Sequence, residues 1–121
     1  LFLFFFFFFF FFFLIIVALQ MTPFAQFAPA VAEFRPDAII LSGLHMLEGE
    51  YRQRRVVDIR NFLVKHDRHL PIHLELASLA DAKLMRLLAD ELIPRVDSLG
   101  LNEQELAFLH RVLFPNADRP G

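Results

Sequence analysis

"FRPDAIILSGLHMLEGEYRQRRVVDIRNFLVKHDRHLPIHLELAS", residues 34–78, contains two short apolar runs that flank a helical pattern. The first run, 38–43, is apolar at successive positions, which predicts a strand buried on both faces. In the middle segment, 48–67, apolar residues recur every three or four positions, as in an amphipathic helix. The second strand is expected within 69–78. A strand, a crossover helix and another strand in this order predict a parallel β-sheet.

The same alternation continues on both sides of this unit. A helix is expected to begin at Pro23, a residue favoured in the first turn of helices. "SLAD", 78–81, places an acid three residues after a Ser, which predicts the N-terminal cap of a helix that ends at Pro94. A third strand within 95–101 and a helix within 102–114 complete the order. The predicted fold class is α/β, with parallel strands alternating with helices.

Composition limits the possible classes of function. The 121 residues can hold at most one small domain. A net charge of -2 indicates no general affinity for nucleic acid, and the arginines within 48–67 are expected to form a solvated helix face. The absence of cysteine excludes disulfides and thiolate metal sites.

The chain opens with "LFLFFFFFFFFFFLIIVALQ", residues 1–20, an apolar low-complexity run. By hydropathy it is helix-prone and transmembrane-like, because residues 1–19 in a helix would extend ~28 Å, close to the thickness of a bilayer core. However, no Lys or Arg precedes Arg35, and no Trp or Tyr marks a membrane interface. The T-rich codons of such a run, ending in a Gln encoded by CAG, would also match an intron read as coding sequence. A membrane segment, a mistranslated intron and another low-complexity origin are the open alternatives.

Parallel sheets bind their ligands at the carboxyl ends of the strands. Three segments of this chain fall there: "SGLHMLEG" (42–49), "ELAS" (75–78) and "GLNEQE" (100–105). We expect these segments to be neighbours in space. The first is either a simple strand-to-helix connection or a loop that faces a substrate. None of them is a glycine-rich phosphate loop of the G-x-G-x-x-G or G-x-x-x-x-G-K type.

His73 and Glu75 are expected on the same face of the second strand, because successive side chains of a strand alternate between faces. Burying an imidazole and a carboxylate without partners would be costly. Two explanations are open. The residues form a structural hydrogen-bonded pair, or they form one side of a site that holds a metal or a phosphate.

Asn102 and Glu105 have the spacing of a helix-capping pair, which needs no further function. Glu105 also follows the carboxyl end of a strand, where its carboxylate could hold a hydrated Mg²⁺ near phosphate oxygens. The two roles are compatible. In the helix that follows, Leu106 is expected to point inward.

Three motifs in sequence order resemble the ADP-dependent glucokinases of the ribokinase-like fold, in particular the eukaryotic type. They are "FRPDAIILSGLHMLEG" (34–49), "PIHLELAS" (71–78) and "VDSLGLNEQELAFL" (96–109). The resemblance covers residues 31–115 and implies a partial ribokinase-like three-layer sandwich. The related ADP-dependent phosphofructokinases are the alternative within the same class.

The resemblance implies transfer of phosphate from ADP to the 6-hydroxyl of glucose, a step of glycolysis, with Mg²⁺ required. Glu75 and Glu105 match family glutamates that are associated with the metal. Asn102 matches a residue of the phosphate and metal region. The substrate-binding residues that the resemblance implies are Gly43, Leu44, His45 and His73.

The sequence departs from the family in one important respect. The family's Gly-x-Gly-Asp motif, whose Asp is the general base, has no counterpart in the 121 residues, so no catalytic residue is assigned. We therefore expect a fragment of the kinase domain at 21–115 with a tail at 116–121, inactive alone because phosphoryl transfer needs groups from several parts of the fold. A non-catalytic, membrane-tethered remnant is a third possibility.

The resemblance also bears on the opening run, since a membrane span does not fit the interior of a kinase domain. The intron origin of residues 1–20 is therefore preferred, and the membrane is a partner only if residues 1–19 are genuine. In that case we expect association with the endoplasmic reticulum or another membrane, and otherwise a cytoplasmic location.

Overall fold

The computed structural model describes residues 3–8, 11–17, 24–66, 68–77 and 79–117 of the chain. Its centre is a five-stranded sheet in the order β1-β2-β3-β4-β5. The strands from β2 to β5 are parallel, and β1 pairs antiparallel with β2. The strand bounds are β1 (Leu3–Phe8), β2 (Phe11–Val17), β3 (Ala38–Ser42), β4 (Ile72–Glu75) and β5 (Ser98–Gly100).

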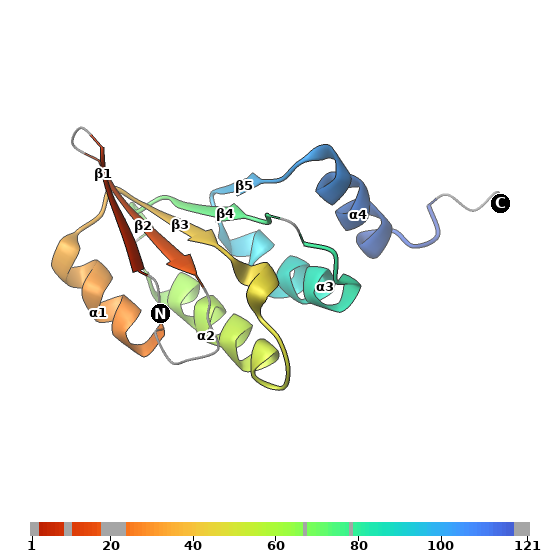
Figure 1. The fold of residues 1–121 in the computed structure, drawn as a ribbon, viewed down its shortest axis with the longest axis horizontal. Coiled ribbons are helices and arrows are strands. Elements are labelled where there is room, and N and C mark those ends of the chain that lie inside the picture. The colour runs from red at the N-terminus through yellow and green to blue at the C-terminus, as the bar shows by residue number, and fades with distance from the viewer. Residues whose placement is uncertain (1–2, 9–10, 18–23, 67, 78, 118–121) are drawn as a thin grey trace.

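Helices alternate with the parallel strands, as the sequence predicts. Their bounds are α1 (Phe24–Phe34), α2 (Tyr51–Lys65), α3 (Ala82–Glu91) and α4 (Glu103–Leu113), with short 3₁₀ turns η1 (Leu44–Met46) and η2 (Ile93–Arg95). Because sequential parallel strands joined by crossovers of one hand place their connections on one face, α1, α2 and α3 lie on the same side of the sheet (Figure 1). The α/β class is confirmed, and the layer formed by α1, α2 and α3 is consistent with part of a ribokinase-like sandwich (Figure 1).

The apolar run at the start of the chain is not the helix expected from its hydropathy. It forms β1 and β2, and β2 pairs with β3 from Phe13 opposite Ala38 to Val17 opposite Ser42. Aromatic and β-branched residues favour strands, and the edge of β3 offers unpaired backbone groups to such a segment. Within the described ranges, no helix is long and apolar enough to cross a membrane.

The core lies between the sheet and the helices. Ile39, Leu41, Ile72 and Leu74 of β3 and β4 are at most 1% exposed, and intervening residues of both strands are only partly buried. The stripe predicted on α2 meets them with three buried side chains: Val56, Ile59 and Leu63. Burying one such side chain contributes roughly 1.5–3 kcal/mol. The described helices therefore cover one face of β3, and the expectation that this strand is buried on both faces was wrong.

Asp81 begins α3, whereas the sequence suggested Ser78, which lies outside the described residues. The Asp81 carboxylate accepts a hydrogen bond from the Leu84 backbone N–H at 3.1 Å and one from Arg52 Nη1 at 2.8 Å. These two contacts, the Leu84 amide first, lower the pKa of Asp81 from its usual 3.8. The acid of "SLAD" thus serves as the cap itself.

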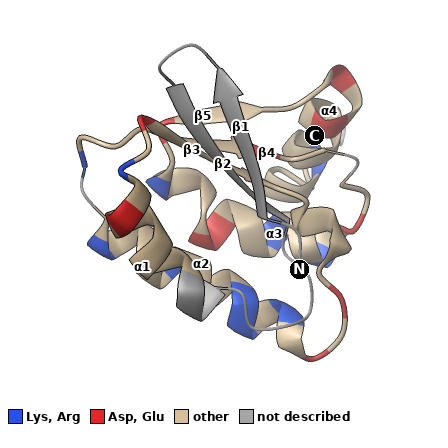
Figure 2. Ribbon diagram, turned by 60° about the vertical axis from the view of Figure 1, so that its left-hand side comes forward, with Lys and Arg blue, Asp and Glu red and all other residues tan. Residues whose placement is uncertain are grey.

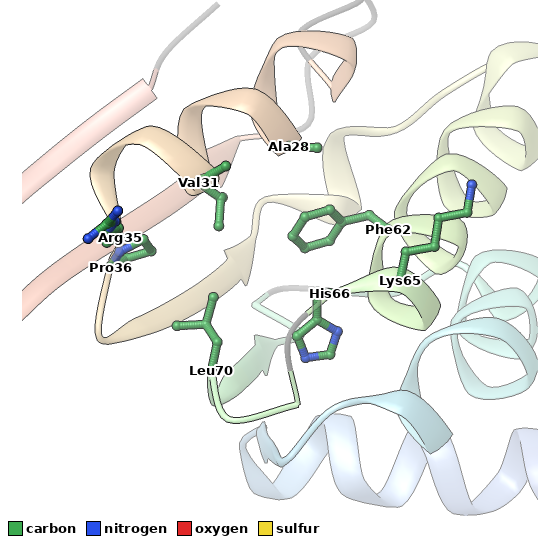
Figure 3. A pocket seen from close by; sticks show the side chains of 9 residues that line it. Ala28, Val31, Arg35, Pro36, Phe62, Lys65, His66 and Leu70 are labelled. Carbon is green, nitrogen blue, oxygen red and sulfur yellow. The ribbon is translucent and has the colours of Figure 1, made fainter.

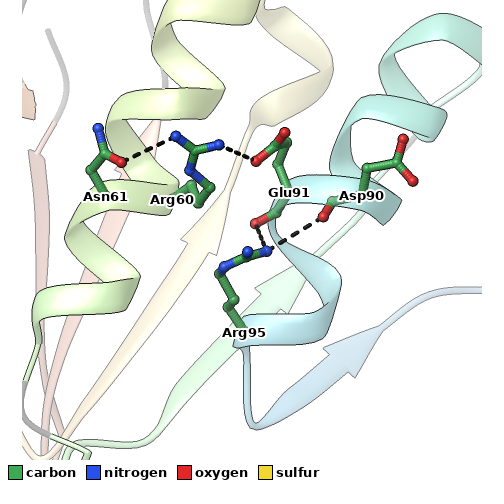
Figure 4. A network of polar contacts seen from close by, with 5 residues as sticks. All are labelled: Arg60, Asn61, Asp90, Glu91 and Arg95. Carbon is green, nitrogen blue, oxygen red and sulfur yellow. Dashed lines mark hydrogen bonds and ion pairs between the residues drawn. The ribbon is translucent and has the colours of Figure 1, made fainter.

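The arginines of α2, visible as the blue segments of that helix in Figure 2, are not simply a solvated face. Arg52 reaches Asp81, and Arg60 Nη1 donates to Glu91 Oε2 at 2.7 Å. Arg95 of η2 donates from Nη1 to the backbone oxygen of Glu91 at 2.9 Å, so three elements meet at this residue (Figure 4). The expectation was wrong for Arg52 and Arg60 because α2 and α3 pack side by side.

Candidate functional site

The three polar segments predicted at the carboxyl ends of the strands do come together. The register places Leu41 of β3 beside Leu74 of β4, and Glu75 of β4 beside Gly100 of β5. Gly43 follows the last residue of β3, and Asn102 lies two residues beyond β5. Because the strands are parallel, all these positions lie along the same edge of the sheet.

His73 and Glu75 form the hydrogen-bonded pair that their alternation suggested. His73 Nε2 lies 3.0 Å from Glu75 Oε2, and the two side chains are 33% and 41% exposed. The opposite ring nitrogen, Nδ1, lies 2.7 Å from Oγ of Ser98 on β5. The hydrogen-bonded pair is therefore present and its carboxylate is partly exposed, while the role of the pair at a metal or phosphate stays a prediction.

Gly100 provides the space that this pair occupies. A Cβ atom at this position would lie 2.7 Å from Cδ of Glu75 and 2.8 Å from Nε2 of His73. Both separations are shorter than van der Waals contact, so the Glu75 side chain must rest against the backbone of β5. Neither Ser98 nor Gly100 was singled out from the sequence. The available signal was the register, since β5 is the only neighbour of β4 on that side among the described strands.

Asn102 and Glu105 form a complete capping box at the start of α4. The Glu105 backbone N–H donates to Asn102 Oδ1 at 2.8 Å, and the Asn102 N–H donates to Glu105 Oε2 at 2.9 Å. Glu105 is only 5% exposed, whereas Leu106, expected to point inward, is 55% exposed. The prediction for Leu106 was wrong because the capping geometry turns Glu105, and with it Leu109, toward the interior.

The loop after β3 is a tight turn. Gly43 has a φ of 81°, a left-handed conformation that glycine adopts without strain, and it starts the 3₁₀ turn η1. Leu44 is 3% exposed and Gly43 is also buried, so neither residue presents much surface to a ligand in this structure. His45 is exposed. The substrate-binding roles of Gly43, Leu44, His45 and His73 stay predictions.

The residues at this edge are compatible with Mg²⁺ but do not form a preformed cage. Within the part of the chain that the structure describes, no three His, Asp or Glu side chains are grouped closely enough to hold a metal ion. Mg²⁺ commonly uses one or two protein carboxylates and takes its other ligands from water and substrate phosphates. Glu75 on β4 is a partly exposed carboxylate of that kind, whereas Glu105 on α4 is only 5% exposed.

A cavity lies elsewhere, at the opposite end of the sheet. It has a volume of about 580 Å³ and lies between α1 and the end of α2. Val31, Phe62 and Leu70 point into it, and Arg35 and Lys65 lie at its rim (Figure 3). None of the predicted site residues lines it, so cavity size does not mark the chemistry of this chain.

A sequential parallel sheet with polar groups at its carboxyl edge is typical of α/β proteins, which bind their ligands at that edge. The ADP-specific phosphofructokinase/glucokinase conserved region matches residues 16–119. The chain therefore belongs to this family of ADP-dependent sugar kinases.

Individual relatives agree with the family assignment. The chain is 42% identical to the probable ADP-dependent glucokinase of Caenorhabditis elegans over 95 residues, covering 76% of this chain and 19% of the relative. Its identity to the ADP-dependent glucokinase of Bos taurus is 42% over 87 residues, or 69% of this chain and 18% of the relative. Its identity to the ADP-specific phosphofructokinase of Pyrococcus furiosus is 35% over 97 residues, which cover 73% of this chain and 21% of the relative. The chain thus spans about a fifth of the length of these curated relatives.

Proposed function

We propose that residues 34–115 supply part of the metal- and phosphate-binding edge of an ADP-dependent glucokinase. Such an enzyme transfers phosphate from ADP to the 6-hydroxyl of glucose and releases AMP and glucose 6-phosphate. One observation carries the proposal: Glu75 lies beside Gly100 in the strand register, and the capping box of α4 begins at Asn102, two residues after Gly100. Two of the family motifs are therefore adjacent in space, as a shared site requires.

Glu75 and Glu105 are the proposed metal-region carboxylates. When bound, Mg²⁺ would neutralise charge on the phosphate oxygens as the phosphoryl group moves. Contacts within the protein determine how each carboxylate is held. The His73 ring holds one oxygen of Glu75, and the backbone N–H of Asn102 holds one oxygen of Glu105. Held in this way, the carboxylates need little reordering when substrate arrives.

The start of α4 is suited to an anionic substrate. The first turn of a helix presents unpaired backbone N–H groups and the positive end of the helix dipole, which favour phosphate. Asn102 and Glu105 accept hydrogen bonds from two backbone N–H groups at this end. Asn102 accordingly has a proposed role in the phosphate and metal region.

Sugar binding is assigned to the loop after β3 and to His73. Gly43 and Leu44 would contribute through the backbone of the tight turn that Gly43 begins, although both residues are buried. His45 would offer an exposed imidazole. The general base is not among these residues, since the sequence has no Gly-x-Gly-Asp motif. We expect no sugar phosphorylation by the 121-residue chain alone.

Glucokinase is favoured over phosphofructokinase because the identity is 42% to the glucokinases of C. elegans and B. taurus and 35% to the phosphofructokinase of P. furiosus. A chimera tests the choice. The matching segment of the bovine enzyme is replaced by the corresponding residues of this chain, and phosphorylation by Mg-ADP is measured with glucose and with fructose 6-phosphate. We expect activity with glucose. A chimera that folds but phosphorylates only fructose 6-phosphate, or neither sugar, would contradict the proposal.

A further inference from the structure

Ser98, His73 and Glu75 form a continuous hydrogen-bonded chain across two strands. The register places Ser98 directly beside His73 and Gly100 beside Glu75. Ser98 Oγ lies 2.7 Å from His73 Nδ1, and His73 Nε2 lies 3.0 Å from Glu75 Oε2. The three side chains of this hydrogen-bonded row therefore all lie on one face of the sheet, each with a partner there.

The chemistry of the end groups sets the direction of these hydrogen bonds. An ionised carboxylate can only accept, so Nε2 of His73 carries the hydrogen that is donated to Glu75. A neutral imidazole has a single N–H, and Nδ1 is then an acceptor for the Ser98 hydroxyl. Ser98 thereby favours the tautomer of His73 that holds Glu75.

Gly100 completes the arrangement from the other side. Two residues after Ser98, it faces the same side of β5, and its missing Cβ leaves the space that the Glu75 carboxylate and the His73 ring fill. A larger residue would displace both groups. Within the described part of the chain, Glu75 Oε2 is held by His73, while Oε1 makes no hydrogen bond and can face a cation.

We propose that Ser98 and Gly100 are positioning residues for Glu75. Ser98 sets the tautomer and orientation of His73, and Gly100 admits the carboxylate to the surface of β5, so that Oε1 is presented at the edge where the metal is expected. The inference rests on the proposed function for the metal role of Glu75. The hydrogen-bonded chain itself is a property of the metal-free protein.

The first measurement is the tautomer of His73 in the metal-free 121-residue chain, read from imidazole ¹⁵N shifts and assigned with His73→Gln. We expect the Nε2–H form to dominate. Ser98→Ala should mix the two tautomers, and Ser98→Thr, which keeps the hydroxyl, should restore the wild-type spectrum. A dominant Nδ1–H form in the wild type, or a spectrum unchanged by Ser98→Ala, would overturn the positioning role.

The second measurement is Mg²⁺ affinity of the same variants by calorimetry. Loss of a group that orients a metal ligand typically weakens binding by about tenfold or more, and we expect this for Ser98→Ala and Gly100→Ala but not for Ser98→Thr. If Ser98→Ala shifts the tautomer while the wild type binds no Mg²⁺, the positioning of Glu75 stands and its proposed metal role fails. Unchanged affinity in Ser98→Ala, with the wild type binding, would refute the link to the metal.

Discussion

Gly100 on β5 lies directly opposite Glu75 on β4, close enough that no side chain larger than hydrogen fits between them. This relationship joins the His-x-Glu motif on one strand to the Asn-x-x-Glu motif that begins two residues beyond the next strand. It predicts a measurable coupling between the two positions.

Gly100→Ala is expected to lower the free energy of unfolding by about 1–3 kcal/mol, the usual cost of forcing extra atoms into a filled space. In a Glu75→Ala background the cost should shrink, because the carboxylate that meets the new methyl group is gone. Urea denaturation of the wild type, the two single variants and the double variant gives the coupling energy between the two positions. Additive effects would mean that the two residues do not share space.

Asp81 should make stability depend on pH at the acid end. Its pKa is lowered from 3.8 by the Leu84 amide and Arg52, so the folded state holds the charged form more strongly than the unfolded state does. The stabilisation is present above pH 3.8 and is lost as the pH falls through the lowered pKa. Melting temperatures between pH 2 and pH 6 should therefore fall less steeply on acidification for Asp81→Asn than for the wild type.

Asp90→Asn is the control for this measurement, since Asp90 forms an exposed ion pair with Arg86 within α3 and is not the N-cap of that helix. It should flatten the pH profile less than Asp81→Asn does. Equal slopes for Asp81→Asn and the wild type would argue against the cap.

The Arg60–Glu91 pair should contribute more than the Arg86–Asp90 pair. The side chains of the first are 32% and 25% exposed and join α2 to α3, whereas those of the second are 55% and 51% exposed within one helix. Double-mutant cycles with alanine should give a coupling near 1 kcal/mol for the first pair and about 0.3 kcal/mol for the second. The reverse ranking would show that the contact in Figure 4 does not hold the helices together.

Burial predicts different costs for truncating two leucines, Leu74 and Leu106. Leu74 is 0% exposed and Leu106 is 55% exposed. Leu74→Ala should cost about 2–5 kcal/mol of unfolding free energy, and Leu106→Ala only about 0.5 kcal/mol. Chemical denaturation monitored by circular dichroism measures both. A costly Leu106→Ala would instead support the inward position expected from helical periodicity.

The strand and helix pattern was predictable because strong hydrophobic runs and turn residues specify it locally. The alternation in "PIHLELA" correctly put His73 and Glu75 on one face, and the spacing of Asn102 and Glu105 correctly predicted a capping box. Both are short-range relationships that depend on one element each.

What the sequence left open depends on contacts between elements. The pairing of β2 with β3 turned an apolar run expected to be helical into a strand. The roles of Ser98 and Gly100 emerge only once the register of β4 and β5 is known. Asp81 could have been recognised as a cap from its residue type, but its contact with Arg52 spans 29 positions and needs the fold.

The central claim is that Glu75 and Glu105 act at a shared metal and phosphate edge. Its most direct test is the Mg²⁺ dependence of glucose phosphorylation by the bovine chimera carrying Glu75→Gln or Glu105→Gln. The matched controls are Glu33→Gln and Glu103→Gln, because both residues are exposed and Glu103 shares the first turn of α4 with Glu105. We expect both site variants to need at least about tenfold more Mg²⁺ for half-maximal activity or to lose kcat by a similar factor, with the controls unchanged. Site variants whose Mg²⁺ dependence and kcat match those of the controls would contradict the account.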